Sequence, residues 1–172
     1  MSETPTLRDV RPVEAGPRSL VWRKTGTGLL ALVVLAGLFG FLGDRVGVVE
    51  GPSGYGHHLR LEYAASTRPG LDVPFEIQIT DPEGLDPEVT IAVTGDYFDM
   101  YETQGWYPEP SDQTRDGEWL YLTFATEEQP VMVIDFDAYI QPVAVKSRDA
   151  QIAVVVDGEP VAPLSFRTVL FP

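Results

Sequence analysis

An uncharged and mostly apolar stretch constrains this chain more than any other feature of its sequence. Residues 25–43, TGTGLLALVVLAGLFGFLG, hold no acidic or basic side chain. As a helix with a rise of 1.5 Å per residue, this stretch would extend about 28 Å, close to the thickness of the hydrocarbon core of a bilayer. Because a helix satisfies its own backbone polar groups there, we expect a transmembrane helix over residues 25–43.

The charged residues on either side of this stretch indicate its orientation. Arg23 and Lys24 immediately precede it, whereas Arg45 follows it and is offset by Asp44. Since basic flanks stay in the cytoplasm, we expect a cytoplasmic N-terminus and a C-terminal part outside the plasma membrane. A cleaved signal peptide is the alternative, because it also has a basic flank and an apolar centre, but no A-x-A cleavage pattern follows the run. We therefore favour a retained single-pass anchor.

Small residues within the predicted helix indicate a surface on which a second helix could pack. Ala36 and Gly40 have the small-xxx-small spacing that lets two helix backbones approach closely. Glycine and alanine are also common in membrane helices without a specific partner, which is the competing interpretation.

The segments on the two sides of the helix differ in composition from the rest of the chain. Residues 1–24 place prolines among charged side chains, which predicts a disordered cytoplasmic tail. Residues 44–56, DRVGVVEGPSGYG, are rich in glycine, which predicts a flexible tether. His57 and His58 follow. Neighbouring residues of a strand point to opposite faces, so this pair indicates the start of a strand rather than a metal site.

Charge and cysteine content exclude several classes of function for the C-terminal part. Residues 44–172 carry seven basic and twenty-three acidic side chains, a net charge of −16. This excess works against binding nucleic acid or an anionic lipid surface, where neutralised phosphate supplies most of the affinity. The chain has no cysteine, so disulfides, thiolate metal sites and cysteine nucleophiles are excluded.

The hydrophobic period of residues 57–172 is two, which is typical of half-buried strands. We predict seven strands, over residues 58–66, 72–80, 88–95, 118–126, 131–140, 151–156 and 160–170. Asp116-Gly117 and Asp157-Gly158 are turn signals, and the second predicts a type I′ hairpin. We therefore expect a mainly β domain, an antiparallel immunoglobulin-like or fibronectin-like β-sandwich, with an isolated barrel as the alternative.

Four segments resemble those of a known group of proteins. They are STRPGLDVPFEIQIT at residues 66–80, YFDMY with GWYPEPS at 97–111, FDAYIQP at 136–142 and VVVDGEPVAPLSFRT at 154–168. With the order of tail, anchor and β-rich part, the chain is similar to small single-pass membrane proteins of actinobacteria whose extracytoplasmic part is an immunoglobulin-like β-sandwich. The resemblance implies this architecture, a location in the plasma membrane with the β-rich part outside, and a role as an accessory to a larger membrane protein.

Motifs for catalysis and cofactor binding are missing from the sequence. There is no G-x-S-x-G elbow, no Walker loop and no G-x-G-x-x-G after a strand, so we assign no catalytic or cofactor-binding residue and predict no enzyme. Clustered carboxylates raise calcium as a ligand, since that ion prefers oxygen donors. The carboxylates concerned are Asp81, Glu83, Asp86, Glu88, Asp96, Asp99, Asp135 and Asp137. Such residues are also ordinary in turns and on solvated strand faces, and we assign no metal ligand.

Aromatic side chains gather in one segment, residues 97–107. Tyr97 and Tyr101 lie four apart and would share one side of a helical turn, either in the core or against a partner. Trp106 and Tyr107 lie between Gly105 and Pro108, which predicts an exposed loop tip that anchors a protein partner or lies at a membrane interface. These four side chains, Tyr97, Tyr101, Trp106 and Tyr107, are our candidates for partner contact.

Two functions are compatible with these observations. The first is a non-enzymatic, membrane-anchored interaction module, an accessory to a membrane protein complex or an envelope component. The alternative is an extracytoplasmic domain that binds a ligand or an ion, either calcium or a cell-wall glycan, through its carboxylates and aromatic rings.

Overall fold

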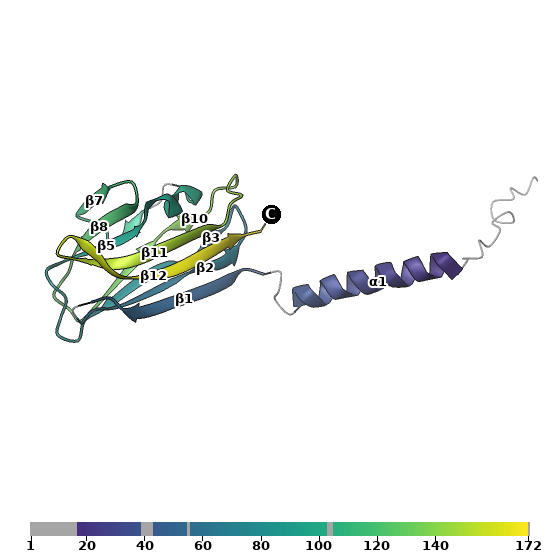
Figure 1. The fold of residues 1–172 in the computed structure, drawn as a ribbon, viewed down its shortest axis with the longest axis horizontal. Coiled ribbons are helices and arrows are strands. Elements are labelled where there is room, and N and C mark those ends of the chain that lie inside the picture. The colour runs from purple at the N-terminus through teal and green to yellow at the C-terminus, as the bar shows by residue number, and fades with distance from the viewer. Residues whose placement is uncertain (1–16, 39–42, 55, 103–104, 172) are drawn as a thin grey trace, which may run out of the picture. The chain divides into compact units, whose positions relative to one another are not determined.

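The computed structural model describes residues 17–38, 43–54, 56–102 and 105–171 (Figure 1). The chain divides into two compact units, residues 1–42 and residues 43–172, and each is described by itself. The first contains one helix and the second is rich in β-strands.

Helix α1, Pro17–Leu38, begins eight residues earlier than the predicted span. Proline suits the first position of a helix, where its missing N–H needs no partner, and Leu20, Val21 and Trp22 extend the helix from there. The expected disorder is therefore wrong for residues 17–24. Residues 1–16 lie outside the described residues, and so does Gly40, so its predicted packing with Ala36 stays a prediction.

The length and composition of α1 allow it to cross a membrane. Arg18–Leu38 is the one such helix in the described part of the chain, and none of its most apolar window is buried. At 1.5 Å per residue its twenty-one residues rise about 31 Å. A signal sequence near the N-terminus satisfies the same criteria.

The flexible tether expected over residues 44–56 is wrong, because most of it is a strand. Strand β1, Arg45–Pro52, pairs antiparallel with β2, His58–Thr67, along its whole length. Two glycines that indicated flexibility serve close packing instead. A Cβ at Gly47 would lie 2.8 Å from the ring of Tyr63, and one at Gly51 would lie 2.9 Å from Leu164.

The seven predicted segments contain seven main strands, although residues 72–80 and 131–140 are each divided and contain a second, short strand. The main strands are β2, β4 (Phe75–Thr80), β5 (Glu88–Thr94), β8 (Trp119–Ala125), β9 (Val131–Phe136), β11 (Arg148–Val156) and β12 (Glu159–Leu170). Short elements join them, namely β3 (Asp72–Val73), the 3₁₀ helix η1 (Gly95–Met100), β6 (Trp106–Tyr107), β7 (Asp112–Arg115) and β10 (Ala138–Tyr139). Asp157 and Gly158 both have positive φ, 52° and 84°, as the predicted type I′ hairpin requires.

The expected immunoglobulin-like sandwich of two separate sheets does not match the observed topology. The main sheet is continuous and strongly curled, in the order β6-β9-β4-β2-β12-β11-β5-β8-β7, with β1 paired to β2 beside this path (Figure 1). It is mixed, because β12 runs parallel to β2 where Val169 and Leu170 meet Ser66 and Thr67. Hydrogen bonds therefore join the two antiparallel halves directly. The result is a half-barrel.

The core fills the inside of this half-barrel. Alternate residues of both halves face inward, and Leu61, Ile77, Ile91, Leu122 and Ile152 are all fully buried in one cluster. Phe75 lies near its centre, with five aromatic rings within 6.3 Å between ring centroids. Burial of these side chains at about 1.5 to 3 kcal/mol each stabilises the domain without disulfides.

The substitution Gly47→Ala tests whether β1 is a packed strand. The new methyl group would meet Tyr63, whose ring is buried and stacks edge-on against Phe166 at 5.0 Å, so we expect a loss of about 1 to 3 kcal/mol in the free energy of unfolding. Gly105→Ala is the matched control, since nothing lies within 4 Å of its Cβ, and it should change stability by less than about 0.5 kcal/mol. Urea unfolding of the full chain in detergent measures both. A tether would instead tolerate Gly47→Ala without loss.

Candidate functional site

Two of the four aromatic side chains predicted to contact a partner lie in the core. Tyr97 is wholly buried and Tyr101 is 3% exposed, so the contact prediction is wrong for both and the alternative core role is confirmed. Tyr97 lies within η1, and Tyr101 follows it as the C-terminal cap and forms a β-bridge with Ile140. Each ring stacks edge-on against neighbours, with Tyr97 and Phe166 at 4.9 Å between centroids.

The hydroxyl groups of these two tyrosines form a buried chain of hydrogen bonds. Thr168 Oγ1 donates to the carbonyl oxygen of Ala64 at 2.7 Å, so it accepts from the Tyr97 hydroxyl at 2.9 Å. Tyr97 in turn accepts from the Tyr101 hydroxyl at 3.0 Å. Burial raises the pKa of Tyr97 to about 12, and burial together with the neighbouring Tyr97 raises the pKa of Tyr101 further.

The other two aromatic candidates, Trp106 and Tyr107, form the short strand β6, where neighbouring side chains point to opposite faces. Trp106 turns inward and packs on Phe136, with the ring centroids 4.6 Å apart. Tyr107 turns outward and is 78% exposed. The predicted loop tip is thus an edge strand of the sheet, and only its second residue presents a large ring to solvent.

Among the described strands, only the short β6 pairs with the outer edge of β9. The Asp137 N–H donates to Gly105 on the β6 side, whereas the Pro130 carbonyl accepts from Asp81 on the β4 side. Because successive residues direct their backbone groups to opposite edges, Val131 and Val133 direct theirs toward β6. Strand β6 reaches only as far as Asp135, because it ends at Tyr107. We call this stretch, Val131 to Ile134, the free edge of β9.

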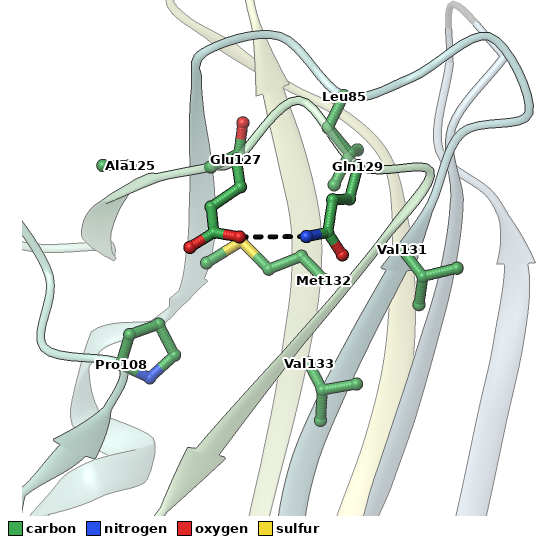
Figure 2. A pocket seen from close by; sticks show the side chains of 9 residues that line it. Leu85, Pro108, Ala125, Glu127, Gln129, Val131, Met132 and Val133 are labelled. Carbon is green, nitrogen blue, oxygen red and sulfur yellow. Dashed lines mark hydrogen bonds between the residues drawn. The ribbon is translucent and has the colours of Figure 1, made fainter.

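A cavity of about 250 Å³ lies beside the free edge (Figure 2). Six of the residues that line it are apolar: Leu85, Pro108, Ala125, Val131, Met132 and Val133. Glu127 and Gln129 cross its upper part in Figure 2, joined by a hydrogen bond of 2.9 Å. Met132 points into this cavity, below that pair. We call the cavity together with the free edge and Tyr107 the β9 groove.

The β9 groove carries negative charge. Glu127 lines the cavity, and the exposed Asp135 is the register partner of Tyr107. Most of the outward positions nearby are apolar, with Val131 40% and Val133 42% exposed. The surface therefore combines an apolar strip with neighbouring acidic side chains.

A second cavity, of about 530 Å³, is polar and lies along the loop between β4 and β5. Five carboxylates line it together with His57, from Asp81, Glu83, Asp86, Glu88 and Asp157. The buried Asp81 is already engaged, because its Oδ2 lies 3.3 Å from His57 Nε2 and its Oδ1 accepts from the Glu83 N–H. His57 is buried and His58 is exposed, as expected for the start of a strand.

The remaining carboxylates considered for calcium are dispersed. Asp96 pairs with Arg148 at 3.0 Å, and Asp99 lies 4.0 Å from Arg115. Among the residues that the structure describes, no group of three or more His, Asp or Glu side chains could hold a metal ion.

Comparisons with protein-family models, with curated proteins and with solved structures give no match. The class of protein is therefore defined by the fold and the site alone. It is a β-rich half-barrel preceded by one apolar helix, with an apolar groove at an open strand edge.

Sequence reasoning missed the β9 groove, although one signal for it was present. The alternation over residues 131–140 directs Met132 and Ile134 inward, which leaves two valines at outward positions where polar residues are usual. The partners that complete the groove come from residues 85, 108 and 125–129, which only the tertiary fold brings to the same place.

The buried tyrosines predict a loss of stability at alkaline pH. An unfolded Tyr97 loses its proton near pH 10.0, whereas the folded protein keeps it until about pH 12. Since the folded state then binds more protons, its full stabilisation is present below pH 10 and the free energy of unfolding falls from there to pH 12. Urea unfolding between pH 8 and 12 measures this slope, which should be shallower in Tyr97→Phe. Equal slopes for both proteins would contradict the assignment.

Proposed function

We propose that this protein is a non-enzymatic, membrane-anchored interaction module whose β9 groove docks a protein partner. The partner is a membrane protein complex or an envelope component, to which this chain is an accessory. The observation that carries the proposal is the exposed Tyr107 beside an apolar cavity and an unpaired strand edge. Exposed tyrosine at the centre of an apolar patch is a common anchor of protein interfaces.

The two outer edges of the sheet differ in a way that supports this role. The edge strand β7 is four residues long, polar, and exposed at every position, which is the usual protection of an open edge against other chains. The free edge of β9 instead presents Val131 and Val133. An apolar open edge invites association, which favours a binding function.

The helix supports the membrane location. A retained α1 with Arg18, Arg23 and Lys24 at its N-terminal end would leave the N-terminus in the cytoplasm and the half-barrel outside the plasma membrane. Loss of the helix as a signal peptide would release the same domain in soluble form. Fractionation of cells that produce the protein, with protease added to intact cells, distinguishes the two.

Photocrosslinking from position 107 tests the proposed docking surface. With benzoylphenylalanine in place of Tyr107 in the anchored protein, we expect one defined membrane or envelope protein to be crosslinked in cells. In Tyr107→Ala, recovery of that protein from mild detergent should fall about ten-fold, the usual effect of removing an interface anchor. Phe171→Ala is the matched control, because it removes another exposed aromatic ring, 42% exposed, at the end of β12. Loss of the partner in both variants, or in neither, would contradict the proposal.

The polar cavity favours a second candidate function, an extracytoplasmic domain that binds a cationic ligand. Its five carboxylates and 530 Å³ would suit a positively charged group better than a glycan. A calcium site is the form of this function that the geometry supports least, since the carboxylates do not converge.

Thermal unfolding with and without calcium tests that form. The described carboxylates offer no cluster for the ion, so we expect the midpoint to stay unchanged when calcium is added to millimolar concentration. Magnesium at the same concentration controls for ionic strength. A calcium-specific rise in the midpoint would contradict our assignment of no metal site.

A further inference from the structure

The free edge of β9 offers a strand partner two kinds of contact at once. The N–H and C=O groups of Val131 and Val133 point away from β4, and among the described strands only β6 lies on that side, ending at Asp135. An extended segment placed there would continue the line of β6 and pair with these groups. Its alternate side chains would then point inward and outward.

The two faces of such a segment would meet apolar surfaces. On the inner face lies the cavity of about 250 Å³ with Met132, Leu85 and Ala125. This volume is below the roughly 300 to 1,000 Å³ of small-molecule sites and suits one or two side chains of a peptide. On the outer face lie the exposed valines and Tyr107, which is paired with Asp135 in the sheet register.

We infer that the β9 groove binds an extended segment of a partner protein by strand addition, and that this segment carries apolar side chains flanked by Lys or Arg. The inference rests on the proposed function and specifies how the partner is held. Charge complementarity argues for the flanking basic residues, because Glu127 lines the groove and the exposed Asp135 is paired with Tyr107 at its end.

Strand addition differs from simple ionic attraction in its dependence on the backbone. We would therefore measure binding of a fluorescent nine-residue peptide, with lysine and valine alternating, to the full chain in detergent micelles. Two further peptides carry N-methyl groups on all valines or on all lysines. Only one of these sets of N–H groups faces β9 in a bound strand, because successive residues hydrogen-bond to opposite sides.

We expect one methylated peptide to bind at least about ten-fold more weakly than the unmodified peptide, the effect of about 1.4 kcal/mol, and the other to bind within about three-fold of it. Equal affinities for all three peptides would overturn strand addition, since they would indicate attraction by charge alone. Equal loss with both would also overturn it, because no single peptide edge would then be used.

Two variants at one position test the protein side of the same pairing. Val133→Pro removes an N–H that points to the free edge and serves no bond to β4, so the sheet should tolerate it while peptide binding falls about ten-fold. Val133→Thr is the control, because it keeps the N–H and the branched shape, and it should bind within about three-fold of wild type. Circular dichroism checks that both variants are folded. If Val133→Pro unfolds, the comparison of the two methylated peptides on the wild-type protein still tests strand addition.

The outcomes separate this inference from the proposed function. A partner crosslinked from position 107 with equal yield in wild type and in folded Val133→Pro would overturn strand addition and leave the interaction module in place. Backbone-dependent peptide binding without any crosslinked protein in cells would support the geometry of the groove and overturn the proposed cellular role.

Discussion

The two halves of the curled sheet meet between β12 and β2, where the buried hydroxyl of Thr168 links them. It bonds to the Ala64 carbonyl of β2 and to Tyr97 of η1, beside the pairing of Val169 and Leu170 with β2. An unsatisfied hydroxyl in a core costs about 1 to 3 kcal/mol, so β12, β2 and η1 must be in place together. The sheet is therefore continuous between the two halves and is open at its two ends, β6 and β7.

The open ends explain why the candidate site lies where it does. The sheet ends at β7 and at β6 with β9, and the chain crosses from one edge to the other after Pro108. Because β6 pairs with β9 for only two residues, the crossing leaves part of β9 uncovered and a cavity beneath it. The groove is thus a direct consequence of incomplete closure. Its apolar valines contrast with the polar residues that protect β7.

The negative charge of the domain and the apolar helix α1 both bear on the role proposed for this groove. In the role that we propose, the acidic domain would attract basic extended segments and repel other acidic chains, including copies of itself. That repulsion counters the association of edges to which exposed strands are prone. If α1 is retained in the membrane, partners in the same membrane meet the groove at high effective concentration, which lets a modest interface function.

Composition and periodicity alone determined the apolar helix, the seven strands and the Asp157-Gly158 hairpin, because each depends on local spacing of side chains. They misassigned β1, since Gly47 and Gly51 indicate flexibility in a sequence and close packing only beside Tyr63 and Leu164. The single curled sheet, the burial of Tyr97 and Tyr101 and the groove at β9 were decided by tertiary structure. Each depends on contacts between residues distant in the chain, and local patterns carry no record of which strands become neighbours.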